Sequence, residues 1–306
     1  MRSYRLVLIC PPEGPDLEPS VVRSAYRCLP DGYRQEPYWL SNGEACQIGF
    51  MVEDKHDELN LPGILADHIR EEVIGDRRID LAVVPDEHRR KKLLVADMES
   101  TIIEQECLDE LADYVGLRPR IADITARAMR GELDFDAAVK ERVGLLKGLD
   151  ASVLDTLYTD RVTLAPGAAA LVKTMKTHGA YCALVSGGFT FFTERIAARL
   201  GFDTHQANTL EIGDGRITGR VTEPILGRQA KLAALQRLAA ERRLRMEETM
   251  AVGDGANDLA MIKAAGLGVA YRAKPLVAAE AHVAIQHGDL TALLYLQGYR
   301  RDEFVE

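Results

Sequence analysis

Most of the sequence after residue 92 alternates short apolar runs with longer amphipathic ones, and this alternation restricts the fold more than any other feature. The apolar runs are residues 93–96, 181–185, 250–252, 268–270 and 282–285. Such alternation is typical of a parallel β-sheet with helices on both faces. We therefore predict an α/β domain over residues 87–306 whose chemistry lies beyond the carboxyl ends of its strands.

A long insertion separates the first two predicted strands. Residues 107–161 contain several helical patterns rich in Ala, Leu, Arg and Glu. An insertion that directly follows the carboxyl end of a strand is placed to cover a site at that end. We interpret it as a helical cap.

Residues 1–86 predict a separate small α+β domain. Its apolar patterns follow the order strand, helix, strand, strand, helix, strand (βαββαβ). The predicted elements are strands at 5–10, near 38, at 47–52 and at 79–84, and helices at 21–28 and 61–72. The charged run 87–92 then predicts a solvated linker.

Composition excludes several classes of function. A net charge of -9 argues against binding to nucleic-acid backbones. The five cysteines are scattered and lack metal-site spacing, so they indicate neither a disulfide framework nor a zinc site. No apolar run reaches membrane-spanning length, and the run near the start is too short for a signal peptide. We expect a cytoplasmic protein with neither nucleic-acid nor membrane partners.

Two carboxylates, Asp97 and Glu99, follow the first strand of the α/β domain, although burying unpaired charge is costly. Alone, such residues could simply cap a helix. Ser186-Gly187-Gly188 after the second strand fits either a tight turn or a phosphate-binding loop. Lys231 alone would fit a solvated surface position.

The third polar motif is the segment 253–258, which contains Asp254, Asn257 and Asp258 after an apolar strand. Its glycines allow close backbone approach, and its two acids can build and brace a cation site. The similar Gly213-Asp214-Gly215 lacks that preceding strand and predicts a hairpin turn instead.

The order of these motifs resembles the haloacid dehalogenase-like phosphatase superfamily, and within it the phosphoserine phosphatase family, across residues 93–290. The resemblance implies a Rossmann-like sheet and an aspartyl-phosphate formed on Asp97. It also implies Mg²⁺ held by Asp97, the backbone carbonyl of Glu99 and Asp254, with Asp258 as a brace. Glu99 would also be the catalytic acid and base.

The same resemblance assigns the remaining site residues. Ser186, Gly187 and Lys231 would bind the phosphate. In the cap, Glu106 would bind the substrate amine, Arg142 its carboxylate, and Phe135 would shield the site. Asn257 is also assigned to substrate binding. Because these cap residues are spread along the insertion, they make the match specific to phosphoserine as the small-molecule substrate.

One position departs from the family, which usually carries Asp where this chain has Glu99. An additional methylene moves a carboxylate by roughly 1 Å, and such a displacement can cost about 10²-fold in rate. Either neighbouring residues compensate or the enzyme is slower than its relatives.

Three functional readings remain open. The first is hydrolysis of phosphoserine to serine and phosphate, the last step of serine biosynthesis. The second is hydrolysis or phosphoryl transfer on another small phosphomonoester. The third is a catalytically impaired amino-acid sensor, in which Glu99 marks a degenerate active site and residues 1–86, which are similar to ACT-like regulatory domains, bind the ligand. That domain could equally serve as a spacer or hold a homodimer together.

Overall fold

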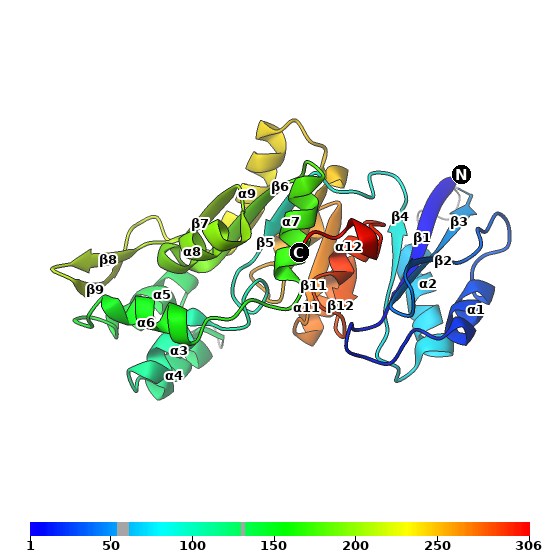
Figure 1. Ribbon diagram of the computed structural model, residues 1–306. Coiled ribbons are helices and arrows are strands. Elements are labelled where there is room, and N and C mark those ends of the chain that lie inside the picture. The colour runs from blue at the N-terminus through cyan, green and yellow to red at the C-terminus, as the bar shows by residue number, and fades with distance from the viewer. Residues whose placement is uncertain (54–60, 130–131) are drawn as a thin grey trace.

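The computed structural model describes residues 1–53, 61–129 and 132–306. Figure 1 shows the N-terminal domain at one end, the α/β domain in the middle and the helical insertion at the other end. Within the described ranges, no helix is long and apolar enough to cross a membrane. All five cysteines are free.

The predicted parallel sheet is confirmed, and it has one strand more than the sequence indicated. Its order is β12-β11-β10-β5-β6-β7, and every pair of neighbours is parallel. The strands are β5 (Leu93–Ala96), β6 (Tyr181–Phe189), β7 (Thr204–Asn208), β10 (Thr249–Gly253), β11 (Leu267–Tyr271) and β12 (Val283–Ile285). The strands β6 and β7 lie on one side of β5, whereas β10, β11 and β12 lie on the other. Because the strand order reverses between β5 and β10, these two strands flank the point where ligands bind such sheets.

Helices cover both faces of this sheet, because alternate residues of each strand point to opposite sides. Leu93 and Val95 share a core with α9 and α10, whereas Leu94 and Ala96 share one with α7, α8 and α12. The helices are α7 (Ala168–Thr177), α8 (Thr190–Leu200), α9 (Arg228–Glu241), α10 (Leu259–Ala264), α11 (Pro275–Glu280) and α12 (Ala292–Leu296). Two 3₁₀ turns are Met246–Glu248 and Arg301–Glu303.

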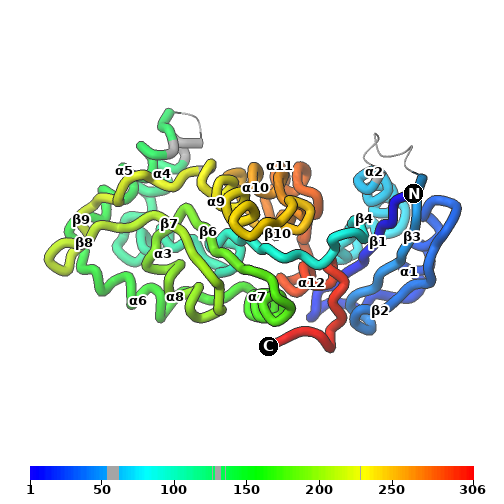
Figure 2. Tube along the Cα trace, turned by 90° about the horizontal axis from the view of Figure 1, so that it is seen from above, coloured from blue at the N-terminus to red at the C-terminus, as the bar shows by residue number. Residues whose placement is uncertain are grey.

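The insertion after β5 is helical, as predicted. It contains α3 (Cys107–Tyr114), α4 (Arg118–Met129), α5 (Phe135–Gly144) and α6 (Ser152–Asp160). The predicted hairpin is also present, as β8 (Leu210–Gly213) and β9 (Arg216–Val221). The sequence did not reveal that this hairpin joins the insertion: the N–H of Gly148 donates to the carbonyl of Ile217 at 2.8 Å. Figure 2 shows the hairpin beside α5.

The N-terminal domain has the predicted βαββαβ order and forms an antiparallel sheet, β2-β3-β1-β4. Its elements are β1 (Arg2–Ile9), α1 (Pro19–Arg27), β2 (Tyr38–Ser41), β3 (Ala45–Val52), α2 (Leu61–Ile69), a π-helical turn (Arg70–Ile74) and β4 (Asp80–Pro85). One face of the sheet packs under its own helices. The other face, including Val7 and Val84, belongs to the same apolar core as α12.

The prediction of a solvated linker at 87–92 is wrong for two of its residues. Lys91 is buried, and its ammonium donates to the carbonyl of Glu247 at 2.7 Å. The guanidinium of Arg89 donates to the carbonyls of Leu296 and Tyr295 at the end of α12. Helix C-terminal carbonyls lack partners within the helix, so a cation from the linker satisfies them.

Candidate active site

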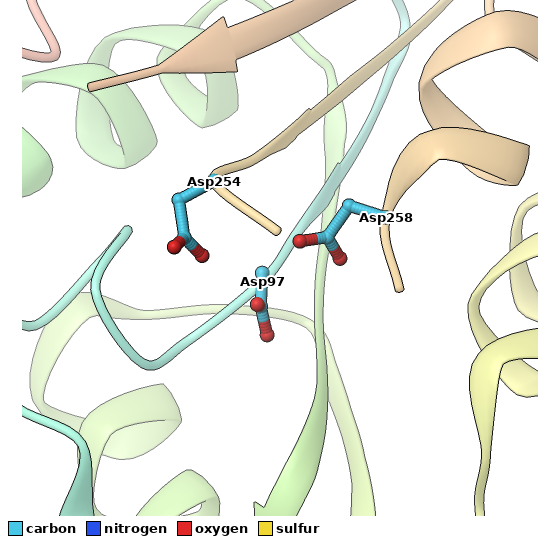
Figure 3. Close-up of side chains that lie close together, drawn as sticks. All are labelled: Asp97, Asp254 and Asp258. Carbon is cyan, nitrogen blue, oxygen red and sulfur yellow. The ribbon is translucent and has the colours of Figure 1, made fainter. Parts of the chain in front are cut away.

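Three acids meet at the carboxyl ends of β5 and β10. Asp97 directly follows β5, and its N–H donates to the carbonyl of Val252 in β10 at 3.0 Å. Asp254 follows β10, and Asp258 precedes α10. One oxygen from each carboxylate lies within 4.8 Å of the others. Figure 3 shows Asp97 and Asp254 at the two strand ends and Asp258 at the start of a helix, with the three carboxylates close together.

Lys231, on α9, is the buried cation of this cluster. Its ammonium lies 2.8 Å from Asp97 Oδ1 and 2.5 Å from Asp258 Oδ1, and 3% of the residue is exposed. Burial alone would lower the pKa of Lys231, but the charges of Asp97 and Asp258 outweigh it and raise the pKa. Lys231 is therefore charged and held inside the site, not a solvated surface lysine.

The cluster carries more negative charge than one lysine can neutralise. Burial, together with the charges of Asp97 and Glu106, raises the pKa of Asp254 to about 7. Burial and Asp97 also raise the pKa of Asp258 to about 7, against the opposing effect of Lys231. Carboxylate oxygens are the ligands that hard divalent cations prefer. The donor set and its excess charge therefore fit a divalent metal ion.

Asp258 is already engaged on both of its oxygens. Oδ1 pairs with Lys231, and Oδ2 accepts a hydrogen bond from the N–H of Gly255 at 3.1 Å. This arrangement ties α9 to the loop that carries Asp254. It supports the predicted bracing role of Asp258.

The Ser-Gly-Gly motif, at the carboxyl end of β6, lies beside Lys231. Ser186 Oγ accepts a hydrogen bond from the N–H of Gly188 at 2.9 Å and is buried. Ser186, Gly187, Lys231 and Asn257 line the same small cavity, of about 10 Å³. The structure thus brings together four residues that the sequence could assign only by resemblance.

Asn208, at the end of β7, is a residue that the sequence did not reveal. Its side-chain N–H donates to the carbonyl of Gly187 at 2.8 Å, and its Oδ1 accepts from the N–H of Leu226 at 2.7 Å. It is buried, so both bonds are protected from water. Asn208 therefore fixes two walls of the cavity relative to each other. Recognising β7 as a strand would have placed it at the same edge of the sheet.

Glu99 fits closely among its neighbours despite its additional methylene. Its Oε1 accepts a hydrogen bond from the N–H of Cys107, the first residue of α3, at 2.9 Å. A Cβ atom at Gly188 would lie 2.7 Å from Glu99 Oε2, so a side chain at this position would displace the Glu99 carboxyl group. Burial, with the nearby charges of Glu106 and Asp97, raises the pKa of Glu99 to about 8. This shift favours the protonated form of the carboxyl group.

The predicted substrate-reading residues of the insertion are less constrained. Glu106 precedes α3, and its Oε1 accepts from Ser100 Oγ at 2.9 Å. Arg142, on α5, donates to the carbonyl of Ala138 in the same helix at 3.2 Å. Among the described residues, its side chain forms no other hydrogen bond and no salt bridge. Phe135 begins α5, but its side chain lies outside the described residues.

Lys274, the residue before α11, is a second cation near the site, and the sequence analysis did not single it out. Its N–H donates to the carbonyl of Asp254 at 3.4 Å. Its positive charge opposes the upward pKa shifts of Asp254 and Glu106. Lys274 therefore adds positive potential beside the acid cluster.

Comparisons with known proteins agree with this geometry. The model of the haloacid dehalogenase-like hydrolase family matches residues 94–263, more than half of the chain. A phosphoserine phosphatase from Streptomyces coelicolor is 48% identical over 227 residues, which are 74% of this chain and 55% of that protein. One from Polaromonas is 45% identical over 210 residues, 67% of this chain and 89% of that protein.

A solved structure extends the similarity to the N-terminal domain. The unliganded probable phosphoserine phosphatase from Vibrio cholerae has a TM-score of 0.75 and 30% identity, covering 99% of this chain and 88% of that one. The chain spans about half the length of the Streptomyces protein, as the 55% coverage states. The chain therefore belongs to the haloacid dehalogenase-like hydrolase family, and within it to the group of phosphoserine phosphatases.

Proposed function

We propose that the protein is a Mg²⁺-dependent phosphatase that hydrolyses O-phospho-L-serine to L-serine and phosphate, the last step of serine biosynthesis. The observation that carries the proposal is the position of Asp97, whose carboxylate lies 2.8 Å from the ammonium of Lys231, a residue that also lines the Ser186 cavity. The division into residues 1–86 and 87–306, with a cap at about 107–161, is part of the same proposal.

Asp97 is placed to act as the nucleophile. Its Oδ1 is bound by Lys231 and by the N–H of Met98, whereas no described residue donates to Oδ2. Oδ2 therefore keeps a lone pair for attack on phosphorus. The oxygen–phosphorus bond to serine breaks as the Asp97–phosphorus bond forms, and water then cleaves the aspartyl-phosphate. Two moderate barriers replace one high barrier.

Mg²⁺ would be held by Asp97, Asp254 and the backbone carbonyl of Glu99, and when bound it supplies positive charge that offsets repulsion between phosphate and carboxylate. The chain adds positive charge of its own through Lys231, which would bind a phosphate oxygen from inside the cavity. Ser186 Oγ and the N–H of Gly187 would bind the others.

Glu99 is the group we assign to proton transfer. Its carboxyl group lies against Gly188, next to the phosphate-binding residues, and carries the proton that a departing serine oxygen needs. After the proton has left, the same carboxylate can accept a proton from the attacking water.

Glu106 and Arg142 would select the substrate. An ammonium group and a carboxylate on one small molecule call for one anionic and one cationic partner, and these two residues supply them. Asn257, which lines the Ser186 cavity, would also contact the substrate, together with Phe135 from the cap.

The test is phosphate release from a panel of phosphomonoesters with and without Mg²⁺. We expect phosphoserine to be the preferred substrate and hydrolysis to require the metal. Preference for a phosphomonoester without amine and carboxylate would refute the substrate assignment. Absence of hydrolysis of every ester in Mg²⁺ would refute the enzyme assignment and leave the sensing role.

A further inference from the structure

Asp80, at the start of β4, is a carboxylate of the N-terminal domain that binds the α/β domain. It is buried, with 4% of the residue exposed. Its Oδ1 accepts from the N–H of Gln286 at 2.9 Å, its Oδ2 accepts from the N–H of Gly288 at 2.7 Å, and the N–H of His287 lies within 3.2 Å of both oxygens. Three consecutive backbone donors thus converge on one anion.

The loop held by Asp80 continues into a turn that contacts the base of the cap. The N–H of Leu290 donates to the carbonyl of Pro166 at 3.0 Å. Gly167 has φ +80°, and a Cβ atom there would lie 2.7 Å from the backbone nitrogen of Thr291. Only glycine permits this contact, so the turn fixes the position of Pro166 and Gly167 closely.

Pro166 and Gly167 end the chain segment that returns from the cap. This segment, residues 161–167, runs antiparallel to the outgoing segment 101–106. The N–H of Ala165 donates to the carbonyl of Ile102 at 2.9 Å, and that of Glu104 to the carbonyl of Thr163 at 3.1 Å. The side chain of Gln105 bonds Thr163 twice more, at 2.8 and 2.9 Å. A linker tied together in this way moves as one body.

We propose that Asp80 is a positioning residue for the cap: the N-terminal domain, through this carboxylate, fixes loop 286–288 and thereby the base of the cap linker. An ionised carboxylate suits this role because charge-assisted hydrogen bonds are roughly twice as strong as neutral ones. The kinetic consequences rest on the proposed function, in which Glu106 and Arg142 of the cap bind the substrate.

Simple docking of the two domains is the competing explanation, and the interface provides a matched control. Glu44 Oε2 accepts a hydrogen bond from the hydroxyl of Tyr295 in α12 at 2.9 Å. This carboxylate also crosses between the domains, but it does not contact loop 286–288. A docking role predicts similar effects from Asp80→Asn and Glu44→Gln, whereas a positioning role predicts an effect from Asp80→Asn alone.

Backbone hydrogen exchange of the full chain, followed by mass spectrometry, tests the structural claim without any substrate. In Asp80→Asn we expect exchange in peptides covering 161–167 and 286–291 to accelerate by about tenfold. Glu44→Gln should leave the 161–167 peptide unchanged. Unchanged exchange at 161–167 in Asp80→Asn, or equal acceleration in both variants, would overturn the proposal.

Kinetics supply the second measurement. In Asp80→Asn we expect kcat/KM for phosphoserine to fall by about fivefold, and that for p-nitrophenyl phosphate, which offers the cap no amino acid, to change by less than about twofold. Equal losses on both esters would overturn the proposal. If the parent protein hydrolyses neither ester, the proposed function fails, while the exchange experiment still tests Asp80.

A milder variant covers the case in which Asp80→Asn does not fold. A Cβ atom at Gly288 would lie 3.2 Å from Asp80 Oδ2 and 3.3 Å from the Cβ of Ala292. Gly288→Ala therefore crowds the carboxylate without removing it. We expect the same pattern with about threefold faster exchange at 161–167, and no change there would contradict the proposal.

Discussion

The two halves of the candidate site differ in how their charged groups are held. In the α/β half, Lys231 is buried and forms direct ion pairs with Asp97 and Asp258. In the cap half, the only hydrogen bond that the Arg142 side chain forms with described residues is to a carbonyl of its own helix, and that of the Glu106 side chain is with the hydroxyl of Ser100. The charged groups of the α/β half are thus already paired with one another, whereas those of the cap half are available to pair with a ligand.

This difference follows from the elements that carry each half. Adjacent strands of one sheet fix the positions of Asp97 and Asp254 to each other through backbone hydrogen bonds. The cap is attached through its paired linker and the hairpin β8–β9, with Arg142 on α5 and Glu106 directly before α3. We infer that the α/β half determines the rate of chemistry and the cap half determines which ester is used.

The largest effect should come from Asp97→Asn, which keeps the shape of the side chain but removes the nucleophile. We expect kcat to fall on the order of 10⁴-fold for every ester in the panel. Circular dichroism should show a native fold, because Lys231 keeps its pair with Asp258. If the folded variant turned over nearly as fast as the parent, the aspartyl-phosphate route would be excluded. The inference that the α/β half determines the rate of chemistry would then fail.

Arg142→Ala should affect one ester and spare the other. We expect kcat/KM for phosphoserine to fall by about 10²-fold, because the substrate carboxylate loses its charged partner, and that for p-nitrophenyl phosphate to change by less than about threefold. Arg127→Ala is the matched control, since Arg127 is another cap arginine but pairs with Glu141. Equal losses on both esters would show that the cap arginine does not read the substrate.

Glu99→Asp tests whether the site has adapted to the longer acid. The bond from the N–H of Cys107 and the contact with Gly188 both depend on the full length of the side chain. We therefore expect the shorter acid to slow phosphorylation of Asp97 by about tenfold, rather than accelerate it, in single-turnover measurements. Glu99→Gln keeps the length and should be slower still. A faster Asp variant would show that Glu99 is misplaced; a fully active Gln variant would exclude its role in proton transfer.

The sequence was most informative where regular geometry dictates position. A parallel sheet brings its strand ends to one edge, so Asp97, Ser186 and Asp254 could be expected to meet before any coordinates existed. Arg89 and Lys91 could not be placed in this way. Arg89 donates to carbonyls at the end of α12 and Lys91 donates to the carbonyl of Glu247, both far away in sequence, and a charged run alone predicts a solvated segment.

The sequence also did not indicate which side chains connect segments that are distant along the chain. Asn208 acts through its amide, which joins two loops that are distant in sequence, and an isolated asparagine after a weak strand pattern carries no signal. The place of the hairpin against the cap was missed for the same reason. Its turn is a local property, but its backbone bonds to residues 148–151 are not.

Asn208→Ala should give the smallest of these effects and tests the division from the α/β side. The substitution removes the donor to Gly187 and the acceptor for Leu226, which loosens the phosphate-binding residues without touching the cap. We expect kcat/KM to fall by about fivefold, and equally for phosphoserine and p-nitrophenyl phosphate, because both present the same phosphate. Two backbone groups left without their partners should also lower the free energy of unfolding by about 1–3 kcal/mol, measured by urea denaturation. Asn208→Asp keeps the acceptor for Leu226 and should retain more activity than the alanine variant if the bond from Leu226 matters. A loss confined to phosphoserine would mean that the cavity walls also position the cap, and the separation of chemistry from substrate selection would fail.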